Sequence, residues 1–233
     1  MASTPALSGT QTFNPALGDI TIQAFQMCGV RPSQLTPEHM TSALMAANMM
    51  QSTWGAKGVN LWQIAPTTVP LVQGTATYTI PGSVITMLDV YITVGTGTTA
   101  TDRYIMPVSR TEYASQPNKL TQGFPTLYWF DRLLSPTITF WPVPDGNETS
   151  FTYYAVSQIQ DANLKNGSLV DIPYYFLEAF LFGLAFRLAL VWNPALAAPY
   201  KALADEAWTN ATTQNIENSM IYLSPITAGY WRT

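Results

Sequence analysis

The spacing of hydrophobic residues changes twice along this chain, and that change constrains the fold more than any other feature. Apolar residues recur at helical spacing over 16–29 and 36–58, and again from residue 171 onward. Between about 60 and 160 the chain is β-branched, aromatic and punctuated by Pro and Gly. Helical and strand periodicities bury different faces, so one element cannot satisfy both. The sequence therefore predicts an α+β fold in which a β insertion separates two helix pairs.

The first helix pair is predicted from its stripes and its ends. Gly29 should stop the first helix, while Thr36 as N-cap and Pro37 at the first helical position should start the second. His39 stands one place beyond Glu38, so no strict capping box is expected. The apolar positions are Leu17, Ile20, Ala24, Met27 and Cys28 in the first helix, and Met40, Leu44, Ala47, Met50 and Trp54 in the second.

Strands are predicted in the central region. Leu88, Val90, Ile92 and Val94 alternate with Asp89, Tyr91 and Thr93, which is the period of a half-buried strand. Residues 126–130, 137–141 and 151–156 are three further candidates. Short strands joined by turns favour an antiparallel sheet or a small β-sandwich.

The second helix pair contains the most apolar segment, 174–192. It is long enough to span a membrane, but it contains Glu178 and Arg187. Nine residues at 100° each place these charges on opposite faces, so a buried bundle helix is favoured over a membrane span. A last helix should run from Pro199 to about Asn215, with Leu203, Ala207 and Ala211 on its inner face.

Together these segments predict a bundle of about four helices, interrupted by the β insertion and followed by an extended tail. The expected divisions are a flexible arm at 1–15, a helical hairpin at 16–59, the β insertion at 60–170, a helix pair at 171–215 and a C-terminal tail at 216–233.

The low charge of the chain narrows the range of functions that it could have. Charged residues make up 10% of the sequence, with 14 acids against 10 bases, whereas about 25% is usual. An acidic balance argues against nucleic-acid binding through a basic surface, and a lone Cys28 against a disulfide scaffold. The first 18 residues show no signal-peptide pattern. A large area hidden against other protein chains explains the charge deficit best.

No catalytic, cofactor-binding or metal-binding residue is predicted. Cys28 and His39 are expected in structural roles, on opposite limbs of the helical hairpin. Two alternatives stay open. The carboxylates Asp131, Asp145, Glu148 and Asp171 could supply a glycosidase pair, and the aromatics Tyr128, Trp129, Trp141, Tyr153 and Tyr154 a sugar-stacking platform.

The tail carries aromatic residues without a helical period. Aromatic anchors in an extended terminus are typical of segments that dock on a partner, and docking is favoured over folding back onto the chain. The anchors are Ile221, Tyr222, Leu223, Tyr230 and Trp231, with Arg232 beside them.

Several motifs resemble those of the head-to-tail adaptor proteins of short-tailed phages. They are Gly123-Phe-Pro125-Thr-Leu-Tyr128, Ile138-Thr-Phe140-Trp141-Pro142-Val-Pro144-Asp145, Tyr154, and Asp171-Ile-Pro173 before a helix with Ala185, Arg187 and Leu188. The resemblance covers about residues 16–215. The family includes packaged-DNA stabilisation proteins and tubular tail protein A.

The resemblance implies a structural virion protein in the neck, without enzymatic activity, cofactor or membrane, assembled in the host cytoplasm. It implies a ring of twelve copies under the portal that extends the DNA channel, retains packaged DNA and receives tail or nozzle proteins. DNA would pass without sequence-specific binding. By the same analogy Ile221, Tyr222, Leu223, Tyr230, Trp231 and Arg232 would contact the portal. The alternatives are then a carbohydrate-binding β module or a cell-wall glycosidase of a phage tail.

Overall fold

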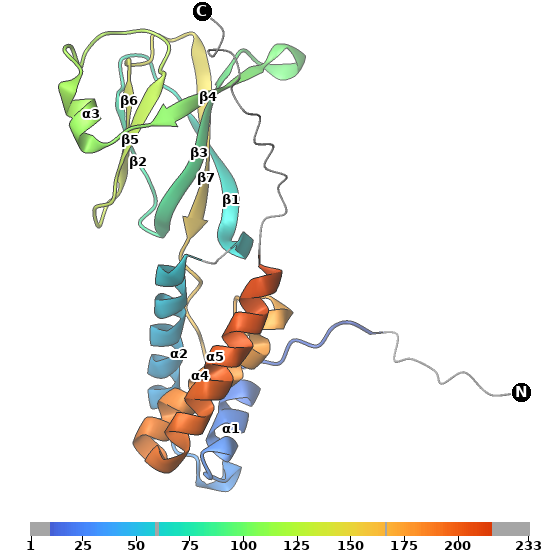
Figure 1. Ribbon diagram of the computed structural model, residues 1–233. Helices are drawn as coiled ribbons and strands as arrows, with labels where there is room; N and C mark the ends of the chain where they lie inside the picture. Colours follow the sequence, from blue (N-terminus) through green and yellow to red (C-terminus); the bar gives the residue numbers. More distant parts are fainter. Residues whose placement is uncertain (1–9, 59–60, 166, 216–233) are drawn as a thin grey trace, which may run out of the picture.

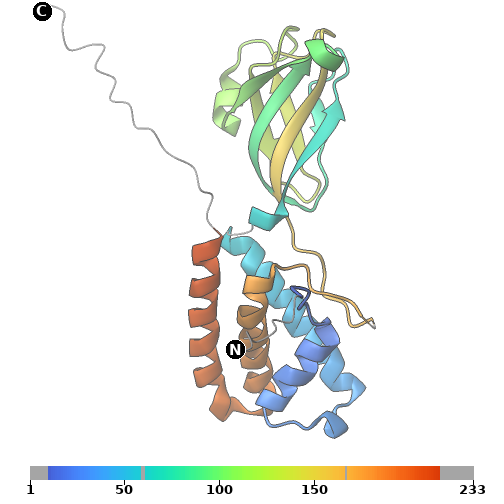
Figure 2. The same ribbon diagram turned by 90° about the vertical axis from the view of Figure 1, so that its right-hand side faces the viewer.

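Helices from both ends of the sequence pack into one half of an elongated molecule, and the residues between them form the other half (Figures 1 and 2). This computed structural model describes residues 10–58, 61–165 and 167–215. The helical half contains α1 (Leu17–Met27), α2 (Pro37–Lys57), α4 (Leu177–Trp192) and α5 (Ala197–Gln214). The α+β class predicted from the sequence is confirmed.

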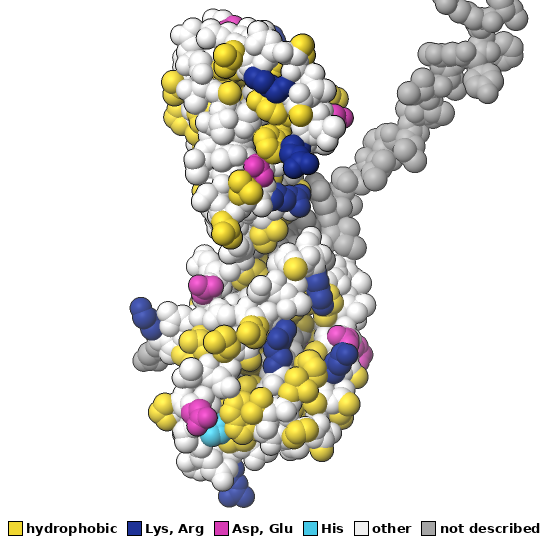
Figure 3. Space-filling view, turned by 90° about the vertical axis from the view of Figure 1, so that its left-hand side faces the viewer, with side chains coloured by type: hydrophobic (Ala, Val, Ile, Leu, Met, Phe, Trp, Pro, Cys, Tyr) yellow, Lys and Arg dark blue, Asp and Glu magenta, His cyan; other side chains and the backbone are white. Residues whose placement is uncertain are grey.

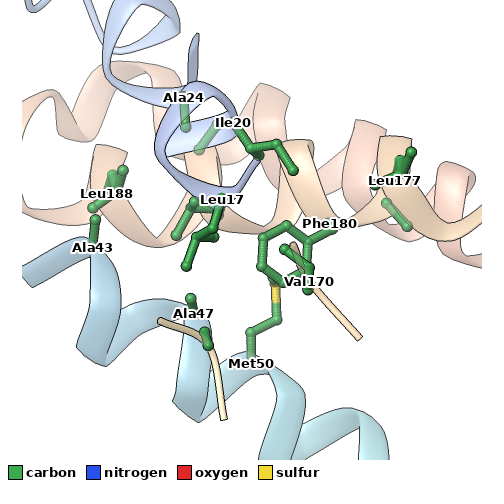
Figure 4. Packing of buried hydrophobic residues seen from close by; sticks show 14 of the residues in the cluster. Leu17, Ile20, Ala24, Ala43, Ala47, Met50, Val170, Leu177, Phe180 and Leu188 are labelled. Carbon is green, nitrogen blue, oxygen red and sulfur yellow. The ribbon is translucent and has the colours of Figure 1, made fainter. Parts of the chain in front are cut away.

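Helix α4 lies at the centre of the helical half because its side chains are apolar on nearly every side. It contacts α1, α2 and α5, and its Phe180, Leu184 and Ala185 are fully buried. Figure 4 shows Leu17 and Ile20 of α1 directed toward α4, with Ala47 and Met50 of α2 facing them. The predicted inner faces of α1 and α2 supply this core.

The ends of the helices follow local chemistry. Thr36 is the N-cap of α2, and Gly58 ends α2 in the left-handed conformation with φ of 71°. The expectation of no capping box is wrong, because the Nδ1 atom of His39 accepts a hydrogen bond from the Thr36 backbone N–H at 3.2 Å. Imidazole here replaces the carboxylate that usually fills this role.

The β half is one curled seven-stranded sheet in the order β1-β7-β3-β4-β5-β6-β2. Six short or medium strands accompany the long β3 (Val84–Val94): β1 (Ile64–Pro70), β2 (Thr77–Thr79), β4 (Thr101–Pro107), β5 (Leu127–Asp131), β6 (Thr137–Trp141) and β7 (Glu148–Ser157). The sheet is mixed rather than purely antiparallel, because β4 and β5 pair in parallel. A connection containing the short helix α3 (Arg110–Ser115) makes that parallel pairing possible.

The curl brings distant strands together around a second core. Phe151 of β7 contacts Tyr78 of β2 and Phe140 of β6, with ring centroids 5.3 and 4.9 Å apart. Since β7 and β2 are five places apart in the strand order, these contacts cross the interior of the curled sheet.

Two expected inward residues point outward. A bulge between Met87 and Asp89 shifts the register of β3, so Met87 is buried and Leu88 is 39% exposed. Leu203 of α5 is 40% exposed, whereas Ala207 and Ala211 are buried as predicted.

The segment Tyr174–Trp192 is long and apolar enough to cross a membrane by length and composition, and 44% of its most apolar window is buried within the chain. Its buried side chains pack on α1, α2 and α5.

Gly183 sets the distance between α4 and α2. A Cβ at this position would lie 2.5 Å from the Met50 sulfur, which is itself buried. We expect Gly183→Ala to lower the free energy of unfolding by about 1–2 kcal/mol, because overpacking outweighs the gain in helix propensity.

Thermal or urea unfolding measures this effect. Gly18→Ala is the matched control, because nothing lies within 4 Å of its Cβ and the helix should be unchanged or slightly more stable. Met50→Ala should lower the free energy of unfolding less in the Gly183→Ala background than in the otherwise unchanged chain. Equal losses in both backgrounds would show that the two positions do not interact.

Candidate functional site

Cys28 and His39 have separate structural partners. The Cys28 thiol is buried and donates to the Ala185 carbonyl oxygen at 3.5 Å. Burial raises the pKa of Cys28 from 9.0 to about 11, which disfavours the nucleophilic thiolate. The His39 ring stacks on Trp192 with centroids 5.1 Å apart. The structure gives this pair no arrangement for nucleophilic catalysis.

The candidate carboxylates are divided between the two ends of the β half. Asp145 holds the turn before β7, where its Oδ1 accepts from the Asn147 backbone N–H at 3.1 Å. Glu148 at the start of β7 is buried, and its Oε2 accepts from the Gly146 N–H at 3.3 Å. Asp171 lies beyond the far end of β7, about 30 Å away at strand rise, and Asp131 ends β5 opposite Thr137. Among the described residues no three His, Cys, Asp or Glu side chains gather as metal ligands.

Asp171 instead forms hydrogen bonds at the junction between the two halves. Its Oδ2 accepts from the Gln63 side chain at 2.8 Å and from the Gln160 backbone N–H at 3.1 Å. Gln63 belongs to the connection from α2 into the sheet, and Gln160 to the connection back to α4. Asp171 thus binds both connections of the insertion, because each connection supplies a donor to its Oδ2.

The candidate aromatic residues do not form one platform. Tyr128 and Tyr153 are buried in the β core. Trp129 stacks on Tyr113 of α3, and the Trp141 indole N–H donates to the Asn118 carbonyl at 2.9 Å, so both support the connection around α3. Tyr154 packs against Tyr91 on a different part of the sheet. The aromatic side chains that could stack on a sugar are thus dispersed over the β half.

The predicted portal-contacting residues Ile221, Tyr222, Leu223, Tyr230, Trp231 and Arg232 lie outside the described residues. The last described helix, α5, ends at Gln214 beside the junction with the β half (Figure 1).

An apolar groove lies on the surface of the helical half. It has a volume of about 910 Å³ and lies between the segment before α1, α1 itself and the first half of α4. We call this surface the arm groove; its main apolar residues are Phe13, Ile20, Tyr174, Leu177, Leu181 and Phe182. Phe13 and Tyr174 are 80% and 78% exposed. Aromatic side chains this exposed are typical of surfaces that bind another protein.

Sequence reasoning missed this groove. Phe13 falls in a stretch interpreted as a flexible arm, and Tyr174 in a segment interpreted as a buried bundle helix. The available signal was Glu178, a charged residue in an otherwise apolar helix. It stands four positions after Tyr174 and therefore lies on the same side of that helix.

Comparison with protein families gives a match over most of the chain. The family model described as SU10 adaptor protein matches residues 30–228, which include every described helix and strand except α1. A comparison with curated proteins finds no match.

The buried environment of Cys28 predicts slow thiol chemistry. With a pKa of about 11, the thiolate fraction at pH 8 is about a hundredfold below that of a thiol of pKa 9.0. We expect a disulfide reagent to label the folded chain at least ~100-fold more slowly than the chain in denaturant.

Labelling followed by absorbance at pH 8 measures this ratio. Tyr174→Cys is a positive control with an exposed thiol on the same folded chain, and should label fast. Equal rates for Cys28 in the folded and denatured chain would contradict the buried assignment.

Proposed function

The chain belongs to the SU10 adaptor protein family, and from that premise we propose that it forms a ring under the portal of a phage head. It is an adaptor, a structural protein of the virion neck. In the proposed ring, the copies extend the DNA channel, help retain the packaged genome and offer an attachment surface to tail components. The family match over most of the chain carries this proposal.

The low charge supports a subunit that is largely covered by neighbours. Interfaces of permanent assemblies are poor in charge and rich in aromatic residues and Met. Exposed large apolar side chains occur on both halves, among them Phe13, Met49, Met106 and Tyr174. Of these, Phe13 and Tyr174 lie together along the arm groove, and contiguous apolar surface of this kind marks an interaction site.

The elongated shape supports two different contacts along one axis. The helical half and the β half lie end to end (Figure 2), and Asp171 accepts hydrogen bonds from described residues of both connections of the insertion. One half can therefore contact neighbouring copies while the other reaches a different protein. The excess of acids over bases would also let DNA slide past without binding.

The tail is the proposed portal contact. Residues Ile221, Tyr222, Leu223, Tyr230, Trp231 and Arg232 combine apolar anchors with one cation, and the family match extends to residue 228. Tyr, Trp and Arg are the residues that most often dominate binding energy at interfaces.

Removal of residues 219–233 tests this contact. We expect the truncated chain to keep its fold and to lose at least ~100-fold in affinity for the portal, since two or more aromatic anchors are removed. Sedimentation and electron microscopy of the mixture with the portal protein measure complex formation, and circular dichroism checks the fold.

A substituted tail separates anchors from tail length. Tyr222→Ala, Tyr230→Ala and Trp231→Ala together should weaken binding nearly as much as truncation, whereas Ser219→Ala, Ser224→Ala and Thr227→Ala together should not. Unchanged portal binding by the truncated chain would refute the role of the tail. No complex with the full-length chain would refute the proposed function.

A further inference from the structure

The arm groove has an acidic rim. Asp19 of α1 and Glu178 of α4 line it, no Lys or Arg does, and both carboxylates are exposed. Neither makes a hydrogen bond or an ion pair with the residues that the structure describes. Apolar walls with unpaired acids at the edge suit an apolar partner that brings positive charge.

A different surface of the helical half has the matching character. Met45 and Met49 lie one turn apart on α2 and are 58% and 56% exposed. We call these two residues, together with a hollow lined by later turns of α2, the α2 face. Thr53, one turn beyond Met49, lines that hollow together with Lys57, Arg187 and Lys201, against a single acid, Asp205. Figure 3 shows Lys and Arg side chains gathered over the helical half among hydrophobic ones.

The two surfaces lie on opposite sides of the helical half. Glu178 lines the arm groove and Arg187 lines the hollow of the α2 face, and nine residues of helix place them about 180° apart around α4. No residue lines both hollows. In Figure 1 the segment leading into α1 leaves the helical half on the right, whereas α2 forms its left side.

Opposite, complementary surfaces favour head-to-tail contact between copies of one chain. Two arm grooves facing each other would bring four unpaired carboxylates together, and two α2 faces would bring six cations together, so a self-matched contact is disfavoured. A contact between unlike surfaces leaves one of each free at the ends of a pair, and it repeats until a ring closes.

We propose that the arm groove of one copy receives the α2 face of the next copy, with Met45 and Met49 against the apolar walls. Asp19 and Glu178 then lie near Lys57, Arg187 and Lys201 of the neighbour. Methionine suits this position because its flexible thioether fits irregular apolar hollows and aromatic rings such as Phe13. The inference rests on the proposed ring and assigns its subunit contact.

Cysteine cross-linking of the full-length chain tests the pairing. Tyr174→Cys places a thiol at the arm groove and Met45→Cys one on the α2 face, while the native Cys28 is buried. A short bismaleimide is added to the free chain and to the chain mixed with portal. The chain carrying both substitutions should give a ladder of oligomers on a denaturing gel. Each single variant should stay monomeric, and a mixture of the two should stop at dimers.

Matched variants make the result specific. Met106→Cys replaces Met45→Cys in the control pair, because Met106 is 63% exposed on β4 of the other half, and no ladder is expected. Dimers from either single variant would overturn the proposal, since they require like surfaces in contact. Absence of a ladder in both samples would overturn it as well. If the double variant binds the portal but gives no ladder, the subunit contact is refuted and the proposed function is not. If it gives a ladder but does not bind the portal, the proposed function is refuted and the subunit contact is not.

Charge reversal gives an independent readout. Asp19→Lys with Glu178→Lys should reduce the yield of the ladder about tenfold, because like charges then meet across the contact. Adding Lys57→Glu and Lys201→Glu should restore most of it. Failure of restoration, with each variant folded by circular dichroism, would contradict the charge pairing.

Discussion

Burial of α4 among helices from both ends of the sequence is the interaction on which the rest of the structure depends. Phe180, Leu184 and Ala185 lose all contact with water only when α1 and α2, which precede the insertion, meet α5, which follows it. The β insertion must therefore begin and end at the same end of the helical half. There Asp171 accepts a hydrogen bond from each of its two connections. The elongated arrangement of the two halves is a consequence of this closure.

The same central position explains the surface. Helix α4 is covered in part by α1, α2 and α5, and its two charged side chains reach the surface at different places. Glu178 emerges in the arm groove, and Arg187 reaches the α2 face, where its guanidinium donates to the Thr53 hydroxyl at 3.3 Å. Partial burial also lowers the pKa of Arg187 below its usual value. In the sequence, the opposed charges Glu178 and Arg187 argue only against a membrane span. In the structure they lie on two surfaces of opposite charge.

Local patterns predicted most elements, because helix caps and period-two alternation act within a few residues. Thr36, Gly58 and the strands at 127–131 and 137–141 lie within a residue of their predicted positions. Local patterns did not suffice where distant segments decide. The bulge that exposes Leu88 depends on pairing with β7, and the role of Asp171 depends on two connections about a hundred residues apart. Parallel pairing of β4 with β5 left no local signal.

The sequence by itself determined the α+β class, the insertion between helix pairs, the scarcity of charge and the resemblance to phage adaptors. Each of these depends on composition, on short-range periodicity or on motifs within one segment. Only the tertiary structure decided which polar residues fasten turns and junctions, and which side of each helix stays uncovered. The arm groove joins Phe13 to Phe182, and no local rule relates residues so far apart. Their proximity exists because burying α4 brings the two ends of the fold together.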